Sequence, residues 1–531
     1  MGIPKLMKDL APYTERARLG KQLEFEVAVS VVALVIDGPS FVYEVYRRQM
    51  RSVSELKAPI AYRDINDAVV DLLDEIQSHG VEMCGKSYRE VFQSTNRCRK
   101  KIYFDGALPE SKRATRLERL EKHRQELESF TKMQVKKVAT KDSSQQPARG
   151  KALLQALASS PVHAPKALEP PFMMASAIER LRQSAYFSVI DLIPDEAEAG
   201  CVMYACQKPS VAMLSSDTDL VVFPYASVKR VTLVLLRTLE EAEPDPGKFV
   251  LMADCLRPWE ISRRLKISSL HLLAYQRYVD PSASSSVIRR AARTTSTVGN
   301  MSPDFLAEYD CIKEVEEALS AQSCSFHLDP RLAELRSQYR GSRHAIDILI
   351  PMQMYLPALF EDPSRESPWQ YGADLRQLAY SLLNFSVPSK LRRANIIEFQ
   401  RRGFRIGGRV VELLSKKSLL QIFGEDTSLL QHVLIGESGA ATMKLWQKLA
   451  LQAVNKRRGE DGRFTFLPVI HLSACIQAVL YSLRLLKQVA ELLSITAPTS
   501  QLVPPDLLGK LTTMPSLANL MDTTQEMYPP K

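Results

Sequence analysis

The 531-residue chain is 45% hydrophobic and 24% charged, which is typical of a globular protein with two or more domains. Its formal net charge of +10 favours an anionic partner such as a nucleic acid. The scattered cysteines form no Cys-x-x-Cys pair, which argues against zinc or a disulfide framework and indicates a reducing intracellular compartment. No signal region is expected, because the N-terminus Met-Gly-Ile-Pro-Lys contains no apolar signal stretch. No membrane span is expected, because the apolar stretch 471–493 carries Arg484 and Lys487.

Three predicted strands end on aspartate. The β-branched apolar run Val27–Asp37 predicts a strand that is buried on both faces of a parallel sheet. A shorter strand is predicted over 99–105 and ends at Asp105, and an apolar run from Val211 ends in Ser-Ser-Asp217-Thr-Asp219. Open α/β sheets bind ligands beyond the carboxyl ends of their strands, so these aspartates predict one shared site.

A predicted helix start adds further carboxylates, because Pro194 is followed by Asp195, Glu196 and Glu198. Clustered carboxylates repel one another unless cations lie among them, and hard oxygen ligands suit Mg²⁺ or Mn²⁺. The alternative is structural: the helix macrodipole alone favours acidic residues at this end, and Asp-x-Asp is common in loops.

A helical insertion interrupts the predicted core after Asp105. Helices over 41–48 and 64–78 precede it. Residues 108–137 predict a long charged helix that stands off the core, because it lacks a wide apolar stripe. Residues 138–171 are rich in Ser, Gln, Pro and Lys and are predicted to be mobile. A helix over 172–184 and a strand over 187–193 then return to the core.

The remainder of the chain is predicted to be mainly helical. A strand over 228–236 and helices over 248–259 and 265–278 are followed by a Ser/Arg/Thr-rich boundary over 280–301. The later predicted helices are 305–321, 330–339, 375–384, 408–423, 441–456 and 471–493. The tail beyond 496 is predicted to be partly disordered.

Five motifs resemble the XPG/flap endonuclease superfamily in order and spacing over residues 1–260. They are Met1-Gly-Ile…Leu10-Ala-Pro, Val35-Ile-Asp-Gly, Tyr103-Phe-Asp-Gly, Pro194-Asp-Glu-Ala-Glu-Ala and Ser216-Asp-Thr-Asp. The resemblance implies a PIN-like α/β fold, with a twisted central sheet flanked by helices, and a site for two Mg²⁺ or Mn²⁺ ions. The implied metal-site and catalytic carboxylates are Asp37, Asp105, Glu196, Glu198, Asp217 and Asp219.

The resemblance also implies roles in binding nucleic acid. Lys112 and Arg119 take the positions of two catalytic basic residues on the family's arch-like helix. Tyr43 takes the position of a tyrosine that stacks on an unpaired base, and Gly2 is expected to contact nucleic acid. The seventh family aspartate, in a Gly-x-Asp-Tyr turn, and the Gly-x-Gly helix-hairpin are absent. Asp254 and Glu260 are the acidic residues considered in the corresponding region.

The C-terminal half resembles asteroid-type members of the superfamily, particularly fungal ones, in 355–369, 375–383 and 398–406. We therefore expect a nuclease core over 1–300, with an arch-like insertion over 108–185, a mostly α-helical asteroid-type domain over 301–500 and a flexible tail over 501–531. The arginines of this half are expected either to contact nucleic acid or to pair with nearby acidic residues. They are Arg392, Arg393, Arg401, Arg402, Arg405 and Arg409, with Glu361, Asp362 and Glu366 as the acidic partners.

Two functions remain open from the sequence. The first is a Mg²⁺-dependent, structure-specific endonuclease that acts on flap, overhang or junction DNA by two-metal-ion catalysis, in DNA repair, with RNA as another substrate. The second is a catalytically weakened nuclease-fold scaffold that binds DNA or RNA in a regulatory complex, which the missing seventh acid favours. A nuclear location is expected, with the cytoplasm as the alternative.

Overall fold

The computed structural model divides into two compact units. The first contains residues 1–48, 67–111 and 180–326, and the second contains residues 49–66, 112–179 and 327–531. The expected boundary over 280–301 falls inside the first unit, and the division into functional domains stays a prediction. The residues that the structure describes are 3, 5–20, 30–31, 33–52, 60–81, 101–107, 112–141, 169–193, 195–208, 211–223, 231–294, 301–309, 328–339, 351–424, 466–496, 503, 508–509, 511 and 514–526.

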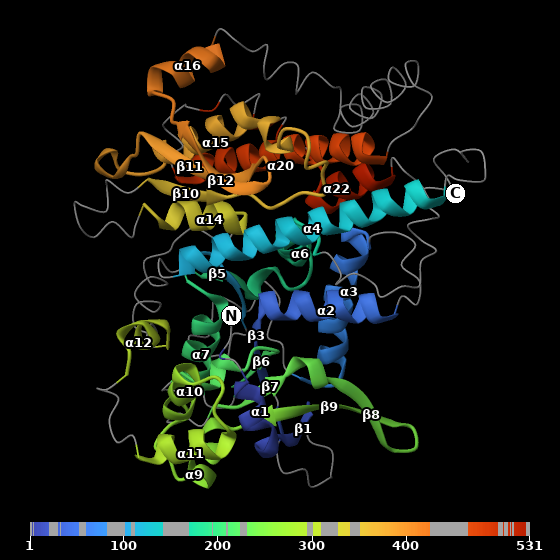
Figure 1. Ribbon diagram of the computed structural model, residues 1–531, viewed down its shortest axis with the longest axis vertical. Helices are drawn as coiled ribbons and strands as arrows, with labels where there is room; N and C mark the ends of the chain where they lie inside the picture. Colours follow the sequence, from blue (N-terminus) through green and yellow to red (C-terminus); the bar gives the residue numbers. More distant parts are fainter. Residues whose placement is uncertain are drawn as a thin grey trace, which may run out of the picture. The chain divides into compact units, whose positions relative to one another are not determined.

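A nine-stranded sheet is the main element of the first unit (Figure 1). Its order is β2-β1-β9-β7-β6-β3-β4-β5, with β8 paired to β9 outside this path. The strands from β7 to β5 in this order run parallel, whereas β9 is antiparallel to both β7 and β1. The strands are β1 Glu15–Leu19, β2 Ser30–Val31, β3 Ala33–Asp37, β4 Ile102–Asp105, β5 Ile190–Ile193, β6 Val211–Ser215, β7 Leu233–Leu235, β8 Glu240–Asp245 and β9 Lys248–Leu256.

The order of the parallel strands places a topological switch point between β3 and β6. The chain moves outward from β3 to β4 and β5, and then returns to the other side of β3 as β6. All residues of β3 and β6 are buried, as predicted for strands covered on both faces. The crevice beyond such a switch point is the usual ligand site of open α/β sheets.

Helices cover this sheet, and α7 (Ala197–Gln207) packs against β3, β4, β5 and β6. Gly200 allows the close approach, because a Cβ atom there would lie 2.8 Å from the Ile193 side chain. In the same unit Arg277 donates to both oxygens of Asp9, at 2.7 and 2.8 Å, and joins α10 to α1. Other helices that include residues of this unit are α1 Leu6–Leu10, α2 Gly38–Ser52, α3 Tyr62–Ser78, α6 Met173–Arg182, α9 Pro258–Leu265, α10 Leu270–Val279, α11 Ser285–Thr294 and α12 Pro303–Tyr309.

The second unit combines helices with a small sheet of order β10-β11-β12. Strand β11 is parallel to β10 and antiparallel to β12. The helix α14 contacts β10, and α15 packs along α20, which also contacts α22 (Figure 1). The elements are α4 Arg113–Lys141, α14 Pro330–Ser337, β10 Met352–Tyr355, α15 Ala373–Phe385, β11 Asn395–Arg402, β12 Arg405–Glu412, α16 Lys416–Gly424, α20 Phe466–Thr496 and α22 Leu517–Glu526.

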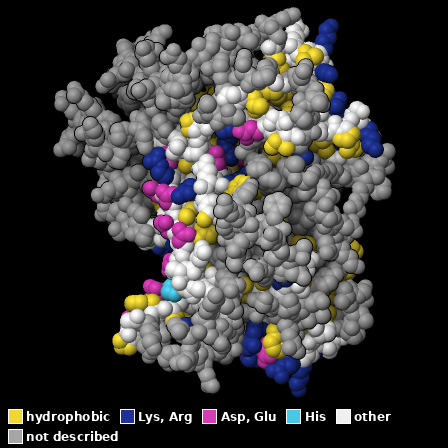
Figure 2. Space-filling model, turned by 180° about the vertical axis from the view of Figure 1, so that it is seen from behind, with side chains coloured by type: hydrophobic (Ala, Val, Ile, Leu, Met, Phe, Trp, Pro, Cys, Tyr) yellow, Lys and Arg dark blue, Asp and Glu magenta, His cyan; other side chains and the backbone are white. Residues whose placement is uncertain are grey.

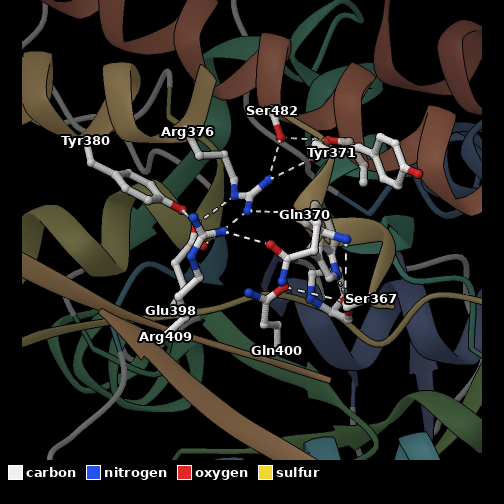
Figure 3. A network of polar contacts seen from close by, with 12 residues as sticks. Ser367, Gln370, Tyr371, Arg376, Tyr380, Glu398, Gln400, Arg409 and Ser482 are labelled. Carbon is white, nitrogen blue, oxygen red and sulfur yellow. Dashed lines mark hydrogen bonds and ion pairs between the residues drawn. The ribbon is translucent and has the colours of Figure 1, made fainter. Parts of the chain in front are cut away.

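A buried ion pair connects the small sheet of the second unit to its helices (Figure 3). Arg376 of α15 donates from Nε and Nη2 to the Glu398 carboxylate of β11, at 2.6 and 3.1 Å. Tyr380 donates to Glu398 at 2.8 Å, and Arg376 also donates to Ser482 Oγ of α20 and to the Trp369 carbonyl. Both charged groups are thus hydrogen-bonded, which is the condition under which buried charges are tolerated.

The helix α4 does not stand off the core as predicted. Its first half contacts β12, and Glu121 accepts a hydrogen bond from the Ile406 amide at 2.9 Å. Arg124 is buried and donates to both Glu121 and Glu128. The Arg124 pairs lie within the helix, whereas the hydrogen bond from Ile406 and the ion pair of Arg116 with Glu334 link it to other elements of the second unit.

Four other expectations are corrected. The predicted helix over 248–259 is mainly strand β9, which follows β8 through a tight turn with Gly247 at φ +78°. The predicted helix over 408–423 begins as β12 and becomes helical only at Lys416. The expected flexible tail contains α22, in which Leu517 and Met521 are buried. The three-stranded sheet was not predicted in this mainly helical half.

Helices α2, α3, α14, α15 and α20 confirm the corresponding predictions. The predicted mobile segment 138–171 is helical to Lys141, and most of the rest of it lies outside the described residues, as does the predicted helix 441–456. No helix within the described ranges is long and apolar enough to cross a bilayer.

Replacing Arg376 by Met leaves the Glu398 carboxylate buried without its ion-pair partner. We expect the free energy of unfolding of the second unit to fall by about 3–5 kcal/mol. Denaturant-induced unfolding followed by tryptophan fluorescence measures this change. Arg405→Met, at an exposed site on β12, is the matched control and should change stability by less than about 0.5 kcal/mol. Equal effects of the two substitutions would contradict the role assigned to the buried pair.

Candidate active site

Asp37 ends β3 and directly precedes α2, and it is 3% exposed. Its Oδ1 accepts a hydrogen bond from the Ser40 amide at 3.3 Å, as an N-cap does, and its Oδ2 accepts one from Ser215 Oγ at 2.6 Å. The next residue, Gly38, has no room for a side chain, because a Cβ atom there would lie 2.6 Å from the Phe104 ring. The Asp-Gly step therefore places this carboxylate where the neighbouring strand passes closely.

Asp105 ends β4 and lies at the N-terminus of α7. Its Oδ1 accepts a hydrogen bond from the Ala197 amide at 2.7 Å, so it satisfies one of the open amides of that helix. Gly106 is also required by close packing, since a Cβ atom there would lie 2.4 Å from the Ile193 carbonyl oxygen. Glu196 is the N-cap residue of α7 and Glu198 lies in its first turn, and both are partly buried.

Asp217 and Asp219 follow β6, as predicted. The Asp217 amide donates to Ser215 Oγ at 2.9 Å, and its Oδ1 accepts from the Asp219 amide at 2.9 Å. Ser215 therefore contacts Asp37 with its hydroxyl hydrogen and Asp217 with its oxygen lone pair. Asp219 is 5% exposed and accepts hydrogen bonds from the Ile3 amide and the Tyr309 hydroxyl.

The carboxylates at the carboxyl edge of the sheet affect the pKa values of neighbouring groups. The pKa of Asp37 is raised to about 7, mainly by burial and in part by the charges of Asp105 and Asp217, against the lowering effect of the Ser215 and Ser40 hydrogen bonds. Burial also raises the pKa of the Cys201 thiol on α7, with contributions from Asp37, Glu198 and Asp105. These shifts connect the predicted acidic residues of β3, β4, β6 and α7 electrostatically.

The side chains do not converge on one point. Among the described residues, no three or more Asp, Glu, His or Cys side chains are grouped so that they could hold a metal ion. Asp37, Asp105 and Asp217 each accept a hydrogen bond from a nearby amide, which directs the carboxylates toward local partners. The available ligand atoms are carboxylate oxygens, which suit a hard divalent cation. One of these carboxylates, Asp37, is buried, and the charges of Asp105 and Asp217 oppose its ionisation.

The residues predicted to bind nucleic acid do not all belong to the first unit. Tyr43 lies half-buried on α2, in the first unit. Lys112 precedes α4 and Arg119 is exposed on it, and both belong to the second unit. Gly2 lies outside the described residues. The roles of all four residues stay predictions.

Both residues considered for the seventh acidic position are paired with arginines. Asp254 on β9 accepts from Arg16 at 3.1 Å, and Glu260 on α9 accepts from Arg263 and Arg264 at 2.6 and 3.1 Å. These contacts indicate structural roles for the two residues.

The C-terminal arginines divide into two groups. Arg401 is buried and donates to Glu361 at 2.6 Å, which confirms intramolecular pairing for this residue, and Arg393 is buried as well. Arg392, Arg402 and Arg405 are exposed, and Arg409 is partly buried and donates to Gln370 at 3.3 Å. On the face drawn in Figure 2, Lys and Arg side chains lie next to Asp and Glu side chains among the coloured residues. Charge alone therefore does not define a nucleic-acid interface on the described part of that face.

Sequence reasoning missed Ser215, Ser40 and Tyr309 at this edge. Ser40 also accepts a hydrogen bond from the Ser216 amide at 2.7 Å and so links the loops after β3 and β6. A signal was present for the two serines, because each lies within three residues of a strand-end aspartate. Tyr309 is 90 residues from Asp219 in the sequence and carries no local signal.

The raised pKa of Asp37 predicts a pH dependence of the metal-free protein. Its ordinary pKa is 3.8 and its folded value is about 7, so between these values the folded chain binds more protons than the unfolded chain. Stability should therefore fall as pH rises through this range, by up to about 1.4 kcal/mol per pH unit. Asp37→Asn should remove this contribution, whereas Asp191→Asn on β5, next to Lys101, should not. Thermal unfolding at pH 5 and 8 with EDTA measures it, and an unchanged pH dependence in Asp37→Asn would contradict the prediction.

Residues 169–413, somewhat less than half of the chain, match a family model described as XPG domain containing. The matched region includes Glu196, Glu198, Asp217 and Asp219, and it extends through β12. No curated protein matches the chain significantly. The predicted resemblance to the XPG/flap endonuclease superfamily is therefore confirmed over residues 169–413, and the predicted mixed α/β fold is confirmed. The asteroid-type assignment stays a prediction.

Proposed function

We propose that the chain is a Mg²⁺- or Mn²⁺-dependent, structure-specific endonuclease that hydrolyses phosphodiester bonds in flap, overhang or junction DNA. The observation that carries the proposal is the buried Asp37 at a switch point, with Asp105 and Asp217 close enough to raise its pKa. A divalent cation at this edge would offset the repulsion that the three carboxylates otherwise experience. The family match supports a nuclease at the coarser level.

The proposed ligands are the carboxylates of Asp37, Asp105, Glu196, Glu198, Asp217 and Asp219. If these residues hold two divalent ions, the ions would supply Lewis acidity toward the scissile phosphate and an activated water. Ser215 holds Asp37 and Asp217 in register through its hydroxyl, and the Ala197 amide fixes Asp105. The positioning of these side chains is the contribution of the protein fold to the proposed reaction.

The remaining predicted residues would act on the nucleic acid. Lys112 and Arg119, on the arch-like segment, would neutralise charge on the phosphate as it is attacked. Tyr43 would stack on an unpaired base without sequence preference, which contributes ~1–3 kcal/mol per base. Gly2 would contact the strand near the site. We propose DNA repair in the nucleus as the setting, because the net charge of +10 suits a polyanionic substrate.

A second candidate function is a nuclease-fold scaffold that binds DNA or RNA without cleaving it. Two observations favour it. The carboxylates are not grouped around one point within the described residues, and Asp254 and Glu260 are paired with arginines. Binding of nucleic acid without hydrolysis is the behaviour that separates it from the first candidate.

Cleavage of end-labelled flap, overhang and single-stranded DNA, with RNA counterparts, tests the proposal. With Mg²⁺ or Mn²⁺ we expect cleavage by the wild type and a loss of at least about 100-fold in Asp217→Asn, because a ligand carboxylate is removed. Asp191→Asn is the matched control, since it removes a carboxylate of the same sheet that faces Lys101, and it should retain activity.

Binding without cleavage would contradict the proposal. If the folded wild type binds these substrates and cleaves none of them with either ion, the scaffold function replaces the nuclease. Lys112→Ala and Arg119→Ala should each lower the cleavage rate without changing the thermal stability of the metal-free protein, and unchanged rates would remove these residues from the proposed site.

A further inference from the structure

We propose that the hairpin of β11 and β12 binds single-stranded nucleic acid, with Phe404 as a stacking platform and the neighbouring arginines as phosphate contacts. The hairpin surface consists of Tyr371, Arg402, Phe404, Arg405 and Arg409. All five residues belong to the second unit, and none of the carboxylates of the candidate active site takes part. The proposal rests on the proposed function only in taking a nucleic acid as the partner, because binding here requires no cleavage.

The tip of this hairpin has a fixed backbone. Arg402 and Arg405 lie directly opposite each other in the ladder, so Gly403 and Phe404 form a two-residue turn. Gly403 adopts φ +61°, which suits the first central position of such a turn. The buried Arg401 donates to the Gly403 carbonyl at 3.0 Å. The backbone is therefore held in place, while the Phe404 side chain projects from the tip.

Phe404 is 64% exposed, so it contributes little to the core. A single exposed apolar residue is ordinary on a protein surface. The position of this one is informative because Arg402 and Arg405, on either side of the turn, are exposed as well. Proteins that bind single strands combine aromatic rings, on which bases of any sequence stack, with cations that follow the phosphates. The turn brings both kinds of group together.

The arginines of the hairpin repel one another. Arg402 and Arg405 form a cross-strand pair, and like charges directly opposite in a ladder are destabilising. Arg409 lies four residues after Arg405 and therefore on the same face of the sheet. None of the three forms an ion pair with a carboxylate of the described residues, and Glu412 lies at the opposite end of β12. A bound polyanion would relieve this repulsion.

Tyr371 supplies a second exposed ring near the same strand. Arg409 donates to the side chain of the preceding residue, Gln370, at 3.3 Å (Figure 3). Tyr371 is 55% exposed, and its ring points away from the buried network around Glu398 (Figure 3). The Cα atoms of Arg405 and Arg409 are about 14 Å apart along an extended strand, which is enough to follow several phosphates.

Substitutions of Phe404 test the stacking role. We expect the affinity for a fluorescently labelled oligothymidylate, measured by anisotropy in EDTA, to fall by about 5-fold or more in Phe404→Ala. Phe404→Leu should lose as much, because leucine keeps an apolar side chain but has no aromatic face, whereas Phe404→Tyr should bind like the wild type. Phe249→Ala, which removes a 54% exposed ring from β9, is the matched control and should not change the affinity.

The salt dependence tests the arginines separately. The double variant Arg402→Ala/Arg405→Ala should lower the slope of log affinity against log salt by about 1.4, because each phosphate contact on a single strand contributes about 0.7. Phe404→Ala should leave this slope unchanged. Lys416→Ala/Lys417→Ala removes the same charge from exposed positions at the start of α16 and should keep the wild-type slope. Melting temperatures should stay unchanged in all variants, because the altered side chains are exposed.

An oligouridylate distinguishes DNA from RNA as the strand that is bound, and a loss of affinity in Phe404→Ala for either one supports the hairpin surface. Wild-type affinity of Phe404→Ala and of the double arginine variant for both oligonucleotides would overturn it. Wild-type affinity of Phe404→Leu would overturn the stacking role. If the wild type cleaves flap DNA while the hairpin variants bind normally, the hairpin surface fails and the proposed function stands. If the variants lose affinity while the wild type cleaves nothing, the surface stands and the nuclease fails.

Discussion

Repulsion among carboxylates at the carboxyl edge of parallel strands is the constraint on which the candidate site depends. The strand order places the ends of β3, β4 and β6 side by side, so Asp37, Asp105 and Asp217 must be close. The pKa of Asp37 is raised to about 7, first by burial and then by the charges of Asp105 and Asp217. A proton or a cation at this edge would relieve the repulsion, and the proposed chemistry uses the cation.

Buried arginines have the corresponding structural role elsewhere. Arg277 holds α10 to α1 in the first unit, and Arg376 joins α15, β11 and α20 in the second. Each is hydrogen-bonded to a carboxylate and to further polar atoms, so the charge is compensated inside the core. The attachment of α4 by Arg116 and Glu334, 2.6 Å apart, follows the same principle. The arch-like segment is thereby tied to the C-terminal half of the chain within one unit.

The predictable part of the fold is the part with local signals. The β-branched run before Asp37-Gly predicted β3, which the structure has over Ala33–Asp37, and the segment Ile102-Tyr-Phe before Asp105-Gly predicted β4. The acidic start of α7 was also visible in the sequence. Strand β9 was mistaken for a helix because an apolar run of this length is ambiguous, although Pro246-Gly247 before it favours a hairpin. The contacts of Asp219 with Ile3 and Tyr309 could not be foreseen, since they depend on packing between distant segments. The sequence also treated both aspartates of the pair alike, whereas their burial and partners differ.

The most direct test of the account is to locate the cation. A crystal soaked in Mn²⁺ and measured at a wavelength where manganese scatters anomalously should show a peak at the carboxyl edge, within coordinating distance of the Asp37, Asp105 and Asp217 carboxylates, at about 2.0–2.2 Å. No peak at this edge at saturating Mn²⁺, with Asp37 still bonded to Ser215, would contradict a metal-dependent site and favour the scaffold function.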